Sequence, residues 1–139
     1  MIFTCNFANW RKIPLKVFPI SIARHAPAGW AGGSYDLLYP TESLLRQYKE
    51  GMLTDSKYTE LYKKFVLSQL DPAKVVNDIY DMADISYSGV VLLCYEHSDK
   101  FCHRHLVSMW LKSHGFSAAE FTIKVPIKNP LGLLRKYHD

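Results

Sequence analysis

The chain has 139 residues, of which 48% are hydrophobic and 22% charged, and its formal net charge is +4. These values are typical of one globular domain and exclude fibrous, low-complexity and disordered classes. The longest apolar run, residues 90–95, is too short to cross a bilayer, and the first residues do not resemble a signal peptide. Because three cysteines without a secretory signal favour a reducing compartment, we expect a single cytoplasmic domain over residues 1–139.

The positive charge is unevenly distributed along the chain. Residues 1–50 carry six basic and three acidic side chains (+3), residues 51–99 carry four and eight (−4), and residues 100–139 carry seven and two (+5). A phosphate-bearing partner, such as a nucleotide or a nucleic acid, could bind the two basic ends. The alternative is a surface whose charges are simply solvated.

The first part of the chain predicts two strands and a long loop. Residues 1–5 are mostly apolar, and residues 14–22 alternate between apolar and polar side chains, as strands do. Pro19 indicates an edge position or a break within the second strand. Residues 23–34 contain three glycines and a proline, so we expect a loop, and loops of this length are often functional.

Three helices are predicted next. Thr41 is a suitable N-cap and Gly51 a suitable stop for the first, the second begins at Thr54 or Asp55, and the Asp71-Pro72 pair begins the third. Helical spacing predicts these inward-facing side chains: Leu44, Leu45, Tyr48, Tyr58, Leu61, Tyr62, Phe65, Val66, Val75, Val76, Ile79, Tyr80 and either Met82 or Ala83.

The last third of the chain completes the pattern. Residues 89–95 predict a strand buried on both faces, residues 96–100 a turn, and residues 102–114 a helix ended by Gly115. Residues 121–125 are predicted as a further strand and residues 126–139 as a basic extension. The alternation of strands and helices predicts a small Rossmann-like or flavodoxin-like α/β domain, with a mostly parallel sheet flanked by helices.

Reactive residue types gather around the last long strand and the helix that follows it. Ligands of open α/β sheets bind beyond the carboxyl ends of the strands, where Cys94 and Glu96 lie. Cys102, His103 and Arg104 stand at the next helix start, where free N–H groups attract anions. Arg104 could hold a phosphate or carboxylate, Glu96 could act as nucleophile, base or charge stabiliser, and His103 could exchange protons.

Each of these residues also has a purely structural interpretation. Cys94 suits the core of an apolar strand, Glu96 and His103 could be solvated, and Arg104 could pair with Glu96. Cys102 at a helix start could carry a reactive thiolate, because that position lowers a thiol pKa.

The ligand types of a zinc site are also present in Cys5, Cys94, Cys102 and His103. However, the chain has no Cys-x-x-Cys motif, and we expect the neighbouring Cys102 and His103 to point in different directions on a helix. We therefore predict no metal and no cofactor.

Several segments together resemble a known family. The segment VLLCYE at residues 91–96, then FCHR at 101–104, then Leu106-Val107 and Trp110-Leu111, resembles the signature of the domain-of-unknown-function 488 family. Further segments that fit its pattern bring the resemblance to about residues 2–116: residues 4–9, 19–24, 27–30, 37–40, 48–51 and 58–62. The resemblance implies a small Rossmann-like domain of bacteria and phages, and proposals link some members to nucleotide or nucleic-acid base processing.

The resemblance also implies a set of site residues: Asn9, Arg24, Glu96, Cys102, His103 and Arg104. The loop with Arg24 and His25 would supply a wall or lid, and Trp30 and Tyr35 could stack on a base. The alternative for Trp30 and Tyr35 is packing of the loop onto the core.

Two functional hypotheses follow. The first is an enzyme that acts on a nucleotide or nucleic-acid base, cleaving or exchanging an N-glycosidic bond with Glu96, His103 and Cys102 as catalytic residues. Arg104, Arg24, Asn9, Cys94, Trp30 and Tyr35 would bind the ligand. The second is a non-catalytic module that binds a nucleotide or an acidic partner in the same pocket, and a thiol-redox or zinc protein comes third.

Overall fold

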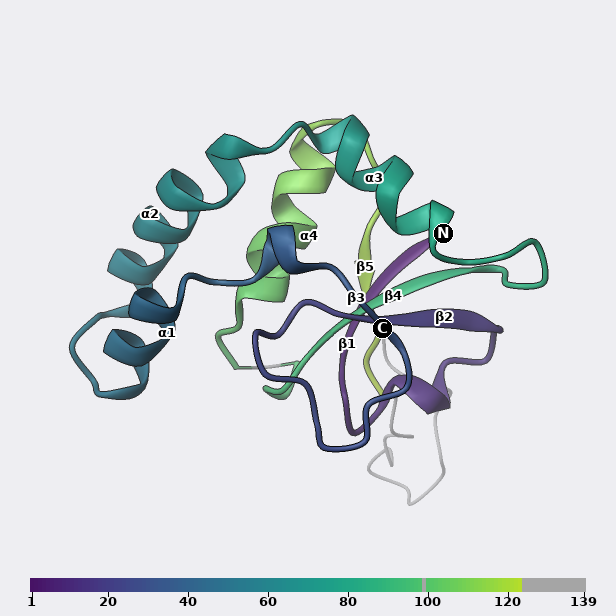
Figure 1. Ribbon diagram of the computed structural model, residues 1–139, viewed down its shortest axis with the longest axis horizontal. Helices are drawn as coiled ribbons and strands as arrows, with labels where there is room; N and C mark the ends of the chain where they lie inside the picture. Colours follow the sequence, from purple (N-terminus) through teal and green to yellow (C-terminus); the bar gives the residue numbers. More distant parts are fainter. Residues whose placement is uncertain (99, 124–139) are drawn as a thin grey trace, which may run out of the picture.

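The computed structural model describes residues 1–98 and 100–123. Within these residues the chain forms one sheet of five parallel strands in the order β3-β2-β4-β1-β5, accompanied by four α-helices (Figure 1). The strands are β1 (Ile2–Asn6), β2 (Val17–Ser21), β3 (Gly33–Ser34), β4 (Gly89–Cys94) and β5 (Ala119–Glu120). This architecture confirms the predicted Rossmann-like α/β class.

The strands differ in detail from the prediction. The second strand begins only at Val17, because residues 14–16 are exposed and outside the sheet. Pro19 lies within β2, but β3 pairs only with Ile20 and Ser21 and does not extend to the proline. Because Pro19 has no partner in β3, its missing N–H removes no hydrogen bond between β2 and β3. The strand predicted at 121–125 is wrong for residues 121–123, because β5 pairs with β1 two residues earlier. Residues 124 and 125 and the predicted basic extension lie outside the described residues.

The helices begin where the capping residues predict. They are α1 (Glu42–Lys49), α2 (Asp55–Phe65), α3 (Pro72–Asp81) and α4 (His103–Ser113). The Thr41 hydroxyl accepts a hydrogen bond from the Leu44 N–H at 3.1 Å, and Asp71 accepts one from the Ala73 N–H at 3.2 Å. Three 3-10 turns complete the elements of residues 1–98 and 100–123: η1 (Trp10–Lys12), η2 (Asp36–Leu38) and η3 (Leu67–Gln69). None of the helices in the described part of the chain is long and apolar enough to span a membrane.

Two predicted inward-facing side chains are exposed. Phe65 is 55% exposed at the end of α2, and Tyr80 is 37% exposed on α3, where its hydroxyl accepts a hydrogen bond from the N-terminal amine. The predicted apolar arc was too wide for α2 and α3, which each meet the core along a narrower stripe. In α2, that stripe consists of Tyr58 and Tyr62, one turn apart.

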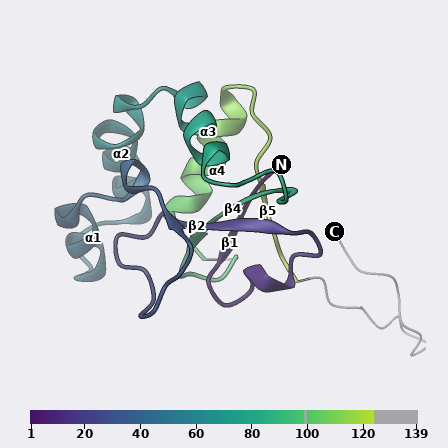
Figure 2. The same ribbon diagram turned by 45° about the vertical axis from the view of Figure 1, so that its right-hand side comes forward.

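The two faces of the sheet are covered differently. Ile20, Val90 and Leu92 belong to a core cluster to which all four α-helices contribute, for example through Tyr62 of α2 and Val107 of α4. Other sheet residues pack instead against the η1 segment and the following loops; this second cluster includes Cys5, Val91, Leu93, Ile13, Trp10 and Trp30. Figure 2 shows the helices gathered on one side of the sheet and the η1 turn on the other. Strand β4 is buried throughout, as its apolar run predicts.

The register brings the carboxyl ends of three strands together. Asn6 at the end of β1 lies opposite Cys94 at the end of β4, and Ser21 of β2 lies opposite Leu93. A short connection then leads from β4 to His103, the first residue of α4. The N-terminus of α4 therefore meets the carboxyl edge of the sheet, where ligands of this fold class bind.

Candidate functional site

A cavity of about 490 Å³ opens at this edge of the sheet. It lies between the ends of β2 and β4, helices α1 and α2, and the start of α4. Its polar lining consists of three basic side chains, two carboxylates, two thiols and an imidazole: Arg24, His25, Lys49, Asp55, Glu96, Cys94, Cys102 and His103. The volume falls in the range of about 300–1,000 Å³ that is usual for small-molecule sites.

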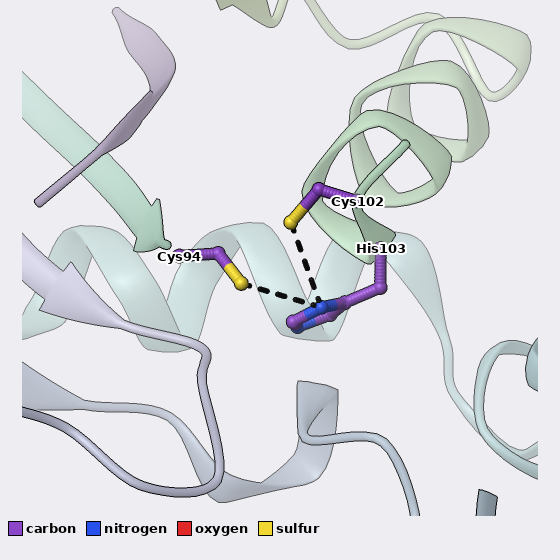
Figure 3. Close-up of side chains that lie close together, drawn as sticks. All are labelled: Cys94, Cys102 and His103. Atoms are coloured by element: carbon purple, nitrogen blue, oxygen red, sulfur yellow. Dashed lines mark hydrogen bonds between the residues drawn. The ribbon is translucent and has the colours of Figure 1, made fainter. Parts of the chain in front are cut away.

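Two sulfurs and an imidazole meet in the buried part of the cavity. The Cys94 Sγ lies 3.6 Å from His103 Nδ1, and the Cys102 Sγ lies 4.0 Å from the same atom (Figure 3). All three residues are buried and line the cavity. We call Cys94, Cys102 and His103 the Cys-Cys-His cluster.

A backbone carbonyl fixes the orientation of the His103 imidazole. His103 Nε2 lies 2.7 Å from the Ile22 carbonyl oxygen, which can only accept a hydrogen bond. Nε2 therefore carries a proton and donates it, which leaves Nδ1 to face the two sulfurs. A proton shared between Nδ1 and a thiol gives either a thiol beside neutral imidazole or a thiolate beside imidazolium.

The convergence of Cys102 and His103 corrects the expectation that these neighbours point apart. Cys102 is not a helical residue: it is the N-cap of α4, and its φ of −156° and ψ of 145° are those of extended backbone. The usual rotation between neighbouring helical residues therefore does not apply to Cys102 and His103. Both side chains reach the end of β4. The helix period was the wrong model for the residue just before the helix.

The two thiols of the cluster differ strongly in acidity. The pKa of Cys102 is lowered because Cys94 donates a hydrogen bond to its sulfur and because His103 and the positive charge of Arg104 stabilise the thiolate. These effects outweigh burial, which alone would raise the pKa. The pKa of Cys94 is raised by that same hydrogen bond and by burial. The third thiol, Cys5, lies outside the cluster, with its Sγ 3.8 Å from the Phe121 carbonyl oxygen. Burial raises the pKa of Cys5 to about 11.

Charged side chains surround the mouth of the cavity. Glu96, His25 and Lys49 are exposed there. Arg24 is half-buried, its Nε donates a hydrogen bond to the Pro40 carbonyl at 3.0 Å, and its guanidinium lies over the Tyr39 ring at 5.9 Å. The mouth thus presents three basic groups and the Glu96 carboxylate to a ligand.

An aromatic wall lines the cavity between α1, α2 and the start of α4. The ring centroids of Tyr48 and Tyr58 lie 5.0 Å apart, and Phe101 lies 5.3 Å from Tyr58 and 5.5 Å from Tyr48. The Tyr48 hydroxyl donates to Asp55 at 2.6 Å, and this hydrogen bond, with burial and nearby negative charge, raises the pKa of Tyr48 to about 12. None of these three aromatic residues is predicted as a ligand contact from the sequence, although Tyr48 and Tyr58 lie in segments that resemble the family.

Arg104 does not line the cavity. Its side chain is fully buried, and its Nε and Nη2 donate to the two carboxylate oxygens of Glu120 at 3.1 and 3.0 Å. The alternative that Arg104 pairs with Glu96 is therefore wrong. Arg104 follows His103 within the helix, so its side chain turns away from the cavity towards β5, where Thr4 also holds Glu120 at 2.7 Å.

Three further predicted ligand contacts lie elsewhere. Asn9 lines a separate cavity of about 290 Å³ beside Asn6, whose side chain accepts from the Asn9 N–H at 2.9 Å. Trp30 donates a hydrogen bond from Nε1 to the Gly33 carbonyl at 2.9 Å and packs edge-on against Phe7. The Tyr35 hydroxyl donates a hydrogen bond to Asp78 at 2.7 Å. Of the loop predicted as a wall, only the part with Arg24 and His25 reaches the cavity with Glu96.

The comparisons with known proteins bear on this cavity. A family model described as the active DUF488-N3 subclade matches residues 4–115, a range that contains every residue lining the cavity. No curated protein and no solved structure matches the chain. The match covers most of the chain, including both strand ends and the start of α4, and on this evidence the chain belongs to the DUF488 family.

Proposed function

We propose that the protein is an enzyme that binds a nucleotide or a nucleic-acid base in this cavity and cleaves or exchanges an N-glycosidic bond. The observation that carries the proposal is the shared lining: Glu96, three basic side chains and an aromatic wall face one cavity. A nucleotide presents the matching groups, namely a phosphate, a sugar that becomes cationic during cleavage, and a flat base.

The placement of the lining residues suits this ligand. Arg24 and Lys49 would hold the phosphate at the mouth, since guanidinium and ammonium groups are good phosphate ligands, and the His25 imidazole could add a hydrogen bond. Tyr48 and Phe101, which line the cavity and are only partly buried, offer ring surfaces on which a base can stack. The DUF488 resemblance points to the same substrate class.

Glu96 would carry the chemistry at the sugar. In hydrolysis, the C1′–N bond breaks and the oxygen of a water molecule bonds to C1′, so that the sugar gains the hydroxyl and the base gains the hydrogen. The Glu96 carboxylate would stabilise the positive charge that develops on the sugar and accept the proton of the attacking water.

The direct test is release of free base. The protein is incubated with nucleosides, nucleotides, single-stranded DNA and duplex DNA, and the products are separated by chromatography. Glu96→Gln should slow base release about 10²- to 10⁴-fold, the usual contribution of a positioned acid or base. Glu42→Gln, which neutralises an exposed carboxylate of α1 outside the cavity, should leave the rate unchanged. Equal rates for wild type and Glu96→Gln would overturn the role of Glu96.

A second candidate is the non-catalytic module, because the basic side chains at the mouth would serve binding alone equally well. In that case a nucleotide would bind with an affinity that falls as salt rises. No substrate in the panel would yield product. This combination of results would replace the enzymatic proposal.

A further inference from the structure

We propose that the Cys-Cys-His cluster binds a zinc ion, with two thiolates and one imidazole as ligands and a fourth position open to the cavity. Zinc sites prefer these ligand types, and the ligand atoms of Cys94, Cys102 and His103 all lie within 4.8 Å of one another. The inference concerns metal binding alone and does not depend on the reaction proposed above.

The two sulfur–nitrogen distances suit a tetrahedral ion. With Zn–S near 2.3 Å and Zn–N near 2.0–2.1 Å, tetrahedral angles place a ligand sulfur and a ligand nitrogen about 3.6 Å apart. The observed Sγ–Nδ1 distances are 3.6 Å for Cys94 and 4.0 Å for Cys102. A shift of a few tenths of an ångström in the Cys102 side chain would bring its sulfur to the same distance from Nδ1. The two sulfurs, which lie within 4.8 Å of each other, would have to stand about 3.8 Å apart around the ion.

The surroundings of the ligands are those of a prepared site. Metal-binding histidines usually donate their other ring N–H to a carbonyl or carboxylate, which fixes the ring and the metal-facing nitrogen. His103 has this arrangement, because Nε2 donates to the Ile22 carbonyl while Nδ1 faces the sulfurs. Cys94 is the last residue of β4, and Cys102 and His103 are the N-cap and the first residue of α4.

The charges also balance. Two thiolates neutralise a divalent ion, and the nearby buried cation Arg104 is already paired with Glu120. A zinc ion would therefore leave the buried region close to neutral, which burial requires.

Three protein ligands with an open fourth position are typical of catalytic zinc, and a Cys₂His set occurs among such sites. All three ligands line the cavity that would hold a substrate. A zinc ion bound there would polarise a water molecule and lower its pKa.

The test is the metal content of the full chain purified under reducing conditions and incubated with zinc chloride. We expect about one zinc per chain by elemental mass spectrometry, as one three-ligand site predicts. Replacement by cobalt should give a thiolate-to-cobalt charge-transfer band in the near-ultraviolet. Because even changes behind the ligands cost about 10- to 100-fold in affinity, Cys94→Ser and Cys102→Ser should each weaken zinc binding more than about 100-fold in competition with a chromophoric chelator.

Cys5→Ser is the matched control, because Cys5 is an equally buried thiol outside the cluster and should keep wild-type zinc affinity. A measurement on the wild type keeps the test valid if a cluster variant fails to fold. The protein is alkylated with and without zinc, and the modified cysteines are identified by mass spectrometry. Zinc should protect Cys94 and Cys102 from alkylation.

Wild-type protein that takes up no zinc would overturn the site, as would equal zinc affinity in Cys5→Ser and the two cluster variants. Alkylation of Cys102 at the same rate with and without zinc would likewise contradict it and point to a free reactive thiol. None of these readouts requires turnover, so loss of the zinc site and loss of the proposed reaction can be told apart.

Discussion

The fully buried Arg104 and the partly buried Glu120 form an ion pair joined by two hydrogen bonds, one from Nε at 3.1 Å and one from Nη2 at 3.0 Å. The pair ties α4 to β5, and Arg104 directly follows the Cys-Cys-His cluster in the chain. An arginine that the sequence assigns to ligand binding thus acts in the core, where it holds the start of α4 against the sheet.

The first prediction concerns this pair. Glu120→Gln should destabilise the fold by about 3–5 kcal/mol, because it leaves the buried guanidinium without a counter-charge. The control is Glu60→Gln, which removes an exposed ion pair with Lys57 and should cost less than about 1 kcal/mol. Urea unfolding of the two variants measures both values. Similar losses of unfolding free energy in the two variants would show that the Arg104–Glu120 pair stabilises the fold no more than an exposed ion pair does.

Tyr62 gives the second prediction. Its hydroxyl is fully buried and donates to the Leu38 carbonyl at 2.7 Å, which links α2 to the η2 turn. Tyr62→Phe leaves that carbonyl without its donor, and the expected cost is about 1–3 kcal/mol. Tyr58→Phe removes a hydroxyl from the neighbouring position on the same helix, on the cavity side, and should cost less. Thermal unfolding compares the variants, and a larger loss for Tyr58→Phe would contradict this assignment.

The third prediction is a pH dependence. Hydrogen bonds from Lys74 and Tyr35 lower the pKa of Asp78 in the folded state. A lowered folded-state pKa stabilises the protein above the unfolded pKa, and this contribution is lost as pH falls through the folded value. Tyr35→Phe should therefore be less stable than wild type at neutral pH, and the difference should shrink below about pH 4. Urea midpoints measured across that range check it; a difference that stays constant with pH would exclude the role of Asp78.

The fourth prediction concerns the mouth of the cavity. Lys49→Ala and Arg24→Ala should each weaken nucleotide binding about tenfold, roughly 1.4 kcal/mol, and reduce its salt dependence. Lys64→Ala, an exposed lysine of α2 outside the cavity, should have no effect. Calorimetric titration at two salt concentrations separates these cases. Equal loss in all three variants would mean that the protein's overall charge, rather than the mouth, attracts the ligand.

The sequence predicted the α/β class, the caps of the helices and the meeting of strand β4 with the start of α4. Local signals sufficed there, because apolar runs and capping residues such as Thr41 and Asp71 act within a few residues. Glu96, Cys94, Cys102, His103 and Arg24 were also selected from the sequence, and the structure brings them to one cavity.

The remaining site residues depended on long-range contacts. Nothing local to Arg104 indicates that Glu120 is its partner, and nothing local to Tyr35 indicates Asp78. Likewise, Tyr48 and Phe101 meet only because α1 packs beside the turn before α4. The direction of Cys102 was mispredicted because the residue before a helix does not follow the helical period.

The most direct test of the proposed enzyme follows both products of a single substrate. Wild-type protein incubated with a nucleotide should release free base and, in equal amount, sugar phosphate with a new hydroxyl at C1′. Glu96→Gln should release neither at a comparable rate. Base release by Glu96→Gln at the wild-type rate, or no base from any nucleotide or DNA offered to the wild type, would contradict the account.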